Sequence, residues 1–254
     1  MIMVIDVIAF DADDTLWHNE SLYAAAQDRF RELLHAYHPD DGALDELYAT
    51  EMANLPLFGY GIKSFALSMI ETAVRLSGSE IAASAIGEII EIAKEMKQAP
   101  VGLLQHVEPV VQSLSRSHKL MLITKGDLLD QERKIANSGL AAYFDHVEIV
   151  TDKTEEVYRT ILEKHRIVPD RFLMVGNSLR SDILPVVALG AHAVHIPYHL
   201  TWAHETAPIH PDDGVKEYAE LEHIGLLPDY VEQLTRHGLM PGAEQSSRQK
   251  EAGC

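Results

Sequence analysis

Three carboxylates and a hydroxyl follow an apolar segment near the start of the chain, in the order Asp11-Ala12-Asp13-Asp14-Thr15. One carboxylate can attack an electrophilic centre or bind a cation, while a second nearby transfers protons. Neighbouring side chains on a strand point to opposite faces and those two apart share a face, so Asp11 and Asp13 can both serve one site just after the strand, where we expect the chain to curl. An isolated acidic run is more often a solvated turn, so its position in the fold decides between the two interpretations.

Three further polar segments also follow short apolar runs. Residues 124–126, Thr-Lys-Gly, end one run, Lys153 follows another, and residues 176–182, Gly-Asn-Ser-Leu-Arg-Ser-Asp, follow a third. Each alone has a plainer explanation, a solvated lysine or a helix cap. Ligands of open α/β sheets bind beyond the carboxyl ends of the strands, so four polar segments at such ends together indicate one site. There Asp182 could share a cation with Asp11.

The segments that must position these residues alternate between strand and helix patterns. Short apolar runs predict buried strands at residues 4–10, 119–124, 147–150, 172–175 and 191–196. Helical patterns occupy residues 107–115, 128–136, 155–164 and 183–189, and a last short helix is expected from Pro228 to about Arg236. This alternation predicts an α/β fold built on a doubly wound, Rossmann-like parallel sheet.

Residues 20–97 interrupt that alternation, because they hold no convincing strand. Leu22, Ala26 and Phe30 follow the spacing of one helical face, and breaks near residues 39–42, 56–61 and 78 predict about four helices. We therefore expect an α/β core at 1–17 and 98–238, an inserted all-helical cap domain at 18–97, and a disordered polar tail at 239–254.

Composition limits the partners of the protein. A formal net charge of −18 disfavours binding to nucleic acid polymers and to anionic membranes, although a small phosphorylated ligand remains compatible with it. The longest apolar stretch, residues 2–10, is about half as long as a membrane-spanning helix requires. The start has no basic leader, and the lone Cys254 allows no internal disulfide. We expect a cytoplasmic protein, with no indication of its oligomeric state.

In this order and spacing, the four segments resemble the motifs of the haloacid dehalogenase-like (HAD) superfamily. Residues 10–16, Phe-Asp-Ala-Asp-Asp-Thr-Leu, resemble the first motif, a hydrophobic strand followed by Asp-x-Asp-x-Thr. Thr124 resembles the hydroxyl residue of the second motif, Lys153 the lysine of the third, and residues 176–182 the acidic fourth motif. The predicted cap is similar in place and type to the C1 cap of that superfamily.

The resemblance implies a magnesium-dependent phosphatase that hydrolyses a small phosphorylated metabolite. Asp11 would be the nucleophile and form an aspartyl-phosphate, and Asp13 would protonate the leaving oxygen and later activate water. Thr124 and Lys153 would hold the phosphoryl oxygens. The dehalogenases of the superfamily lack an acid at the position of Asp13, because a halide leaves without a proton, so Asp13 favours phosphoryl transfer.

The resemblance also implies ligands for the metal and the substrate. The expected Mg²⁺ ligands are Asp11, the backbone carbonyl of Asp13, Asn177 and Asp182. Asn177 stands where the superfamily usually has an aspartate, and its uncharged amide should weaken metal binding. The expected substrate-binding residues are Thr15, Trp17, Lys125 and Gly126, with Phe58, Tyr60 and Lys63 where the cap would face the site.

Two other functions stay open on the sequence. A phosphomutase uses the same nucleophile and cap but returns the phosphoryl group to the substrate. The protein could also be a weakly active member of the superfamily that binds a phosphorylated ligand without turnover. Asn177 is the only residue that suggests this function. The cap residues choose the substrate, and we expect the cap to open and close about boundaries near Trp17 and Pro100.

Overall fold

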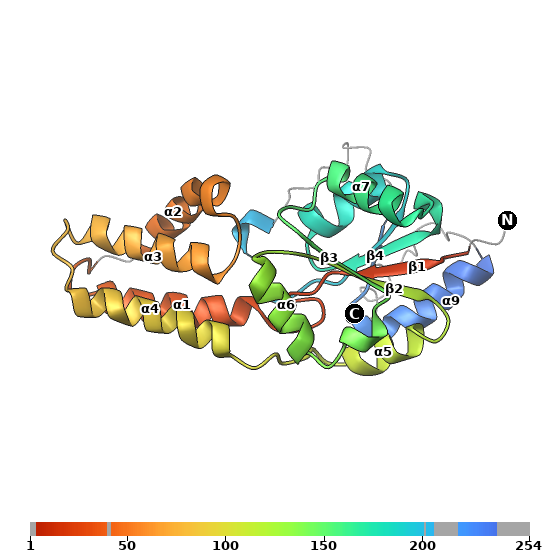
Figure 1. Ribbon diagram of the computed structural model, residues 1–254, viewed down its shortest axis with the longest axis horizontal. Helices are drawn as coiled ribbons and strands as arrows, with labels where there is room; N and C mark the ends of the chain where they lie inside the picture. The colour runs from red at the N-terminus through yellow and green to blue at the C-terminus, as the bar shows by residue number, and fades with distance from the viewer. Residues whose placement is uncertain (1–3, 40–41, 201, 206–217, 238–254) are drawn as a thin grey trace, which may run out of the picture.

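The computed structural model describes residues 4–39, 42–200, 202–205 and 218–237. They form two parts side by side, a bundle of helices on the left and an α/β core on the right in Figure 1. The predicted tail at 239–254 lies outside the described residues. Within the described part, no helix is both long enough and apolar enough to cross a membrane.

The core contains a six-stranded, wholly parallel sheet in the order β3-β2-β1-β4-β5-β6. Its strands are β1 Val7–Phe10, β2 Lys119–Lys125, β3 His146–Val150, β4 Phe172–Gly176, β5 His192–His195 and β6 Ala219–Glu220. The sheet grows outward in both directions from the central strand β1, which confirms the doubly wound fold. The two-residue strand β6 was not predicted, because it is too short to show a hydrophobic pattern.

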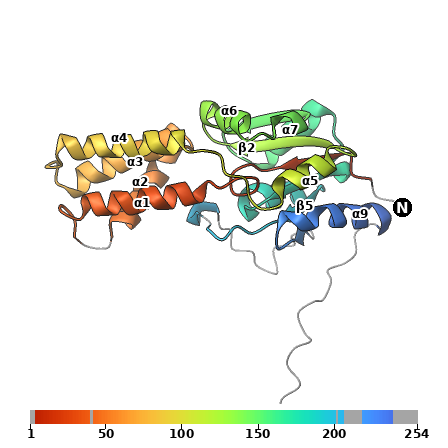
Figure 2. The ribbon, with the colours of Figure 1, turned by 90° about the horizontal axis from the view of Figure 1, so that it is seen from below.

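Side chains alternate along the strands between two buried faces. Ile8 and Phe10 of β1 pack into one apolar cluster, and Val7 and Ala9 pack into the other. Helices cover both faces, which explains why the strands read as continuous apolar runs. Helices α5 (Val107–Leu114) and α9 (Leu227–His237) lie against the first face, next to each other in Figure 2.

The other core helices follow the strands whose ends carry the polar segments. They are α6 (Leu128–Asn137), α7 (Glu155–His165) and α8 (Leu184–Ala188), and α7 and α8 pack against the second face of the sheet. A single helix was predicted at residues 183–189. The structure instead has a π-helical turn at Leu179–Ile183 that leads into the short α8.

Four helices form the cap: α1 (Glu20–Leu34), α2 (Ala43–Phe58), α3 (Ile62–Leu76) and α4 (Ala83–Gln98). They bury an apolar cluster of their own, separate from the two clusters of the core. The break between α2 and α3 lies at residues 59–61, within the predicted range 56–61, and Pro56 is accommodated in the last turn of α2. Gly59 and Gly61, with φ of 70° and 114°, make the turn into α3.

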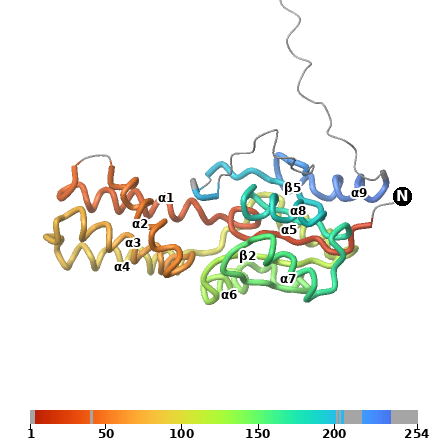
Figure 3. Tube along the Cα trace, turned by 90° about the horizontal axis from the view of Figure 1, so that it is seen from above, coloured from red at the N-terminus to blue at the C-terminus, as the bar shows by residue number. Residues whose placement is uncertain are grey.

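The two chain segments that join cap and core run side by side. Trp17 and Leu103 form an antiparallel bridge, the His18 amide donates to the Gly102 carbonyl at 3.0 Å, and the Leu104 amide donates to the Leu16 carbonyl at 2.9 Å. In Figure 3 the red and the yellow-green connections pass together between the two parts. The cap is thus inserted through one paired, hydrogen-bonded neck.

Candidate functional site

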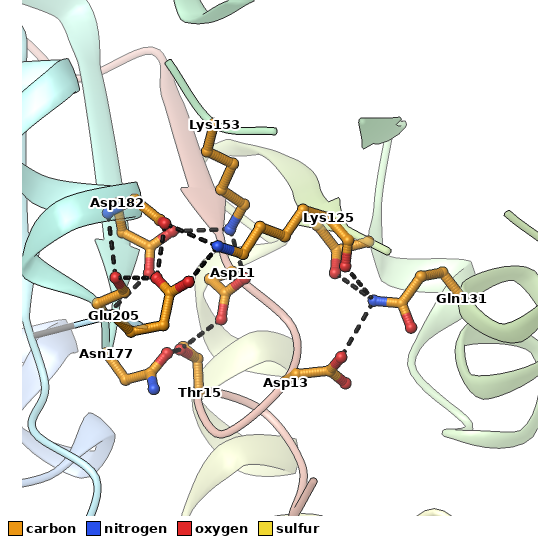
Figure 4. A network of polar contacts seen from close by, with 12 residues as sticks. Asp11, Asp13, Thr15, Lys125, Gln131, Lys153, Asn177, Asp182 and Glu205 are labelled. Atoms are coloured by element: carbon orange, nitrogen blue, oxygen red, sulfur yellow. Dashed lines mark hydrogen bonds and ion pairs between the residues drawn. The ribbon is translucent and has the colours of Figure 1, made fainter. Parts of the chain in front are cut away.

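The four polar segments meet at the carboxyl ends of the strands, where the cap faces the core (Figure 4). A cavity of about 170 Å³ lies there, enough for one small organic molecule. Its wall includes Asp11, Asp13, Thr124 and Lys153 from the core, and Tyr60 from the cap.

Lys153 links the two most buried carboxylates of the site. Its ammonium forms an ion pair with Asp11 and donates to Asp182 Oδ1 at 2.7 Å. All three residues are at most 6% exposed. Burial raises the pKa of Asp11 to about 7, against the opposing effect of Lys153. Burial alone would lower the pKa of Lys153, but the two carboxylates raise it overall, so this lysine stays protonated.

Thr15 joins the first and fourth motifs through its hydroxyl. The oxygen lies 3.0 Å from Asp11 Oδ2 and 3.2 Å from Asn177 Oδ1. A hydroxyl has one hydrogen, so the two acceptors share it. This contact leaves Asp11 Oδ2 close to the Asn177 amide oxygen, on the side of the carboxylate away from Lys153 (Figure 4).

Asp13 is held by three donors and turns toward α6, away from Asp11 (Figure 4). The Lys134 ammonium lies 2.6 Å from both of its oxygens, the Trp17 indole donates to Oδ1 at 2.6 Å, and the Gln131 amide donates to Oδ2 at 3.2 Å. The Gln131 amide nitrogen also lies 2.5 Å from the hydroxyl of Thr124. Helix α6 therefore positions side chains of the first and second motifs together.

Lys125 extends to the other side of the cavity. It forms an ion pair with Glu205, lies 3.0 Å from the Ser181 hydroxyl, and has its ammonium 4.4 Å from the ring centre of Tyr60. Burial would raise the pKa of Glu205, but Lys125 and the hydroxyls of Ser178 and Ser181 lower it to about 2. Glu205 thus stays charged and neutralises Lys125.

Gly176 allows Asp182 to approach the backbone. A Cβ atom at this position would lie 2.3 Å from Asp182 Oδ2. The same oxygen accepts a hydrogen bond of 3.0 Å from the Ser178 amide, which closes the turn. The absence of a side chain at Gly176 is therefore what places the fourth-motif carboxylate beside Lys153.

We expect Gly176→Ala to lower the free energy of unfolding by about 1–3 kcal/mol, because Asp182 must move away from the new methyl group. Urea unfolding measures this loss. Gly87→Ala is the matched control, since a Cβ at this position in α4 meets no atom within 4 Å. Alanine should there stabilise the helix by about 0.5–1 kcal/mol. Equal effects of the two substitutions would contradict this role of Gly176.

Several expected site residues lie outside the cavity wall. Trp17 is 1% exposed and contacts Asp13, and Thr15 is 1% exposed and contacts Asp11, so both orient the first motif from behind. Phe58 is 53% exposed on the cap surface, and Lys63 pairs with Asp127 at 2.7 Å. Lys125 and Gly126 do line the cavity, as expected substrate contacts would.

Other residues at the site were not predicted. They include Glu20, Tyr23, Glu51, Asp130, Gln131, Lys134, Trp202 and Glu205, all of which line the cavity. Gln131 and Lys134 are three apart on a helix that follows the second motif, a spacing that places them on one face. That signal could have been found in the sequence. Glu20 and Glu51 come from α1 and α2, so only the packing of the cap brings them to the site.

The oxygen atoms of Asp11, Asn177 and Asp182 are of the kind that Mg²⁺ prefers. Within the residues that the structure describes, no three His, Cys, Asp or Glu side chains gather into a metal site of their own. Two carboxylates and an amide nevertheless fit Mg²⁺, which keeps several waters and often takes further ligands from a bound phosphate. The side chain of Asp13 faces Lys134 instead, so this residue could contribute only its backbone carbonyl.

Comparisons with known proteins agree with this architecture. A profile of haloacid dehalogenase-like hydrolases matches residues 5–190. A haloacid dehalogenase-like family hydrolase from Xanthomonas campestris is 35% identical, with a TM-score of 0.81 over 92% of this chain and 97% of that one. No match to this chain was found among curated proteins.

More distant structures share the fold. The putative HAD-hydrolase YfnB from Bacillus subtilis, bound to magnesium, has a TM-score of 0.63 at 14% identity over 90% of this chain and 99% of that one. A 2-haloacid dehalogenase from Pseudomonas syringae has a TM-score of 0.60 at 20% identity over 91% and 99%. With its motifs meeting at one edge of the sheet and a profile match over most of its length, this chain belongs to the haloacid dehalogenase-like hydrolases.

Proposed function

We propose that this hydrolase is a magnesium-dependent phosphatase that cleaves a small phosphomonoester in the cytoplasm. The observation that carries the proposal is that two carboxylates of the first motif, Asp11 and Asp13, line one cavity with the hydroxyl of Thr124 and the ammonium of Lys153. Two carboxylates serve nucleophilic and proton-transfer roles, and the other two groups suit phosphoryl oxygens.

Asp11 is the proposed nucleophile. One of its oxygens attacks phosphorus and forms a new P–O bond while the bond to the ester oxygen breaks. Lys153 and Thr15 hold the carboxylate from two sides, which fixes its orientation for attack. When bound, Mg²⁺ would supply positive charge that offsets the charge of the phosphate.

Asp13 is the proposed acid and base. It gives a proton to the departing ester oxygen, which leaves as an alcohol, and then takes a proton from the water that attacks the phosphorus. Breaking the bond between Asp11 and phosphorus releases inorganic phosphate. In the structure the carboxylate of Asp13 is held on the α6 side by Lys134, Trp17 and Gln131. The Asp13 side chain must therefore turn toward the leaving group when substrate binds.

A 2-haloacid dehalogenase is the competing activity within this family. Its leaving halide needs no proton, which would leave Asp13 without a task. The presence of Asp13 in the cavity wall therefore favours the phosphate ester.

The test is phosphate release from para-nitrophenyl phosphate by the purified protein, with Mg²⁺ and with EDTA. We expect turnover that falls at least about tenfold when EDTA removes the metal. Chloride release from 2-chloropropionate without phosphate release would identify a dehalogenase. Phosphoryl exchange between sugar phosphates without net phosphate release would identify a mutase, and binding of phosphate without either reaction would identify a ligand-binding member.

A further inference from the structure

The cap side of the cavity carries carboxylates that the proposed mechanism does not use. Glu20 begins α1, Glu51 lies in the middle of α2, and both line the cavity. Burial is the main cause that raises the pKa of each, to about 7 for Glu20 and about 8 for Glu51, and the charge of Glu20 adds to the shift of Glu51. The two groups are therefore near each other and poorly solvated.

A third carboxylate, Asp130 of α6, also lines this part of the cavity. Asp130 is 8% exposed, and its Oδ2 atom accepts no hydrogen bond from the described residues, although Oδ1 pairs with Lys97. The phenol of Tyr23 lies among these groups, since Glu20, Asp130 and Glu51 all add to the rise of its pKa that burial begins. A buried carboxylate oxygen without a donor marks a place that a ligand donor would satisfy.

The basic groups of the cavity are already neutralised. Among the described residues, its wall contains three lysines. Lys125 pairs with Glu205, Lys134 with Asp13, and Lys153 with both Asp11 and Asp182. The ion pairs found in the described part of the chain include no basic partner for Glu20 or Glu51. Within the described residues, these two glutamates next to the cap thus have no positive partner, and a bound cation would favour their charged forms.

Aromatic side chains complete this end. Tyr60 and Trp202 meet edge to face with ring centres 6.1 Å apart, and the Trp202 side chain hydrogen-bonds to the Glu51 carboxylate. Tyr23 packs edge to face against Phe65 at 5.0 Å. Carboxylates set among aromatic rings suit an organic cation, because both kinds of group attract positive charge.

We infer that the natural substrate is a phosphomonoester whose alcohol carries a positively charged amine, with the phosphate at Asp11 and the ammonium between Glu20, Glu51 and Asp130. This inference rests on the proposed phosphatase function. An ammonium offers up to three hydrogen-bond donors, enough for Asp130 Oδ2 and the two glutamates. An alcohol that carries a carboxylate or a second phosphate would instead meet two unpaired glutamates.

The test compares kcat/KM for three phosphate esters of similar size: 3-aminopropyl, propyl and 2-carboxyethyl phosphate, with saturating Mg²⁺. We expect the amine to exceed the neutral ester at least about tenfold, mainly through KM, and the carboxylate to be the poorest substrate. In the double variant Glu20→Gln/Glu51→Gln, the ratio of amine to neutral ester should fall about tenfold. Glu88→Gln, on the exposed face of α4, is the matched control and should keep the wild-type ratio.

The outcomes separate this inference from the function on which it rests. Equal or better hydrolysis of the carboxylate ester would overturn the inference and leave the phosphatase function standing. The inference would also be overturned if the double variant kept the wild-type preference for the amine ester while its thermal unfolding showed that it is folded. No release of phosphate from any of these esters or from para-nitrophenyl phosphate would overturn the phosphatase function and the inference together.

Discussion

Asp11→Asn should abolish phosphate release, with a loss in kcat of at least about 10³-fold. The amide is a poor nucleophile and cannot form the aspartyl-phosphate, whereas its size and its contact with Thr15 are preserved. Phosphate release from para-nitrophenyl phosphate measures the loss. Intact mass of the protein quenched in acid during turnover tests the intermediate, since the wild type should carry one added phosphoryl group and the variant none.

Asp6→Asn is the matched control for that experiment. Asp6 lies just before the same strand but pairs with Arg171 at the surface, far from the carboxyl end of β1. Its activity should equal that of the wild type. If Asp11→Asn kept a tenth of the activity, with its mass showing no return of the amide to aspartate, another nucleophile would have to carry the reaction.

Lys153→Met should lower the free energy of unfolding more than Gly176→Ala does, by on the order of 3–5 kcal/mol. The substitution leaves Asp11 and Asp182 buried side by side with no positive charge between them. The pKa of Asp11 in the folded state, which burial already raises to about 7, must then rise further above that of the unfolded chain. A folded state that binds protons more tightly loses stability as pH rises, so the defect should be greater at pH 8 than at pH 5.5.

Urea unfolding at both pH values in EDTA measures this defect. Lys119→Met is the matched control, because Lys119 is exposed at the start of β2, and its effect should stay within about 0.5 kcal/mol. Added Mg²⁺ should recover part of the stability of Lys153→Met, since a cation can replace the lost charge. A defect that does not change with pH would mean that lost packing, not the unpaired carboxylates, destabilises the variant.

The sequence predicted the architecture of the core because a parallel sheet buried on both faces leaves uninterrupted apolar runs. Each of the five longer strands lies within a few residues of its predicted range, and the polar residues that follow them meet as expected. The contact of Lys153 with Asp11 joins residues 142 positions apart, and the motif order alone indicated that they would share a site.

What the sequence could not predict depends on packing between distant segments. The direction of the Asp13 side chain follows from Lys134 and Trp17, which hold it on the α6 side. The acidic end of the cavity exists only because the packing of the cap brings Glu20 of α1 and Glu51 of α2 to the site. The π-helical turn that places Asp182 depends on the close approach at Gly176, which leaves no periodic signal in the sequence.

The paired neck between cap and core also bears on how the chain folds. Val7 of β1 pairs with Lys119 of β2, so forming the centre of the sheet closes a loop of more than 100 residues. Such a closure is slow because its entropy is lost before the contacts form. A cap that folds early on its own apolar cluster ties Trp17 to Leu103 and shortens the loop to the few residues on either side. We therefore expect the insertion that shapes the cavity also to hold the two ends of this loop together while the sheet assembles.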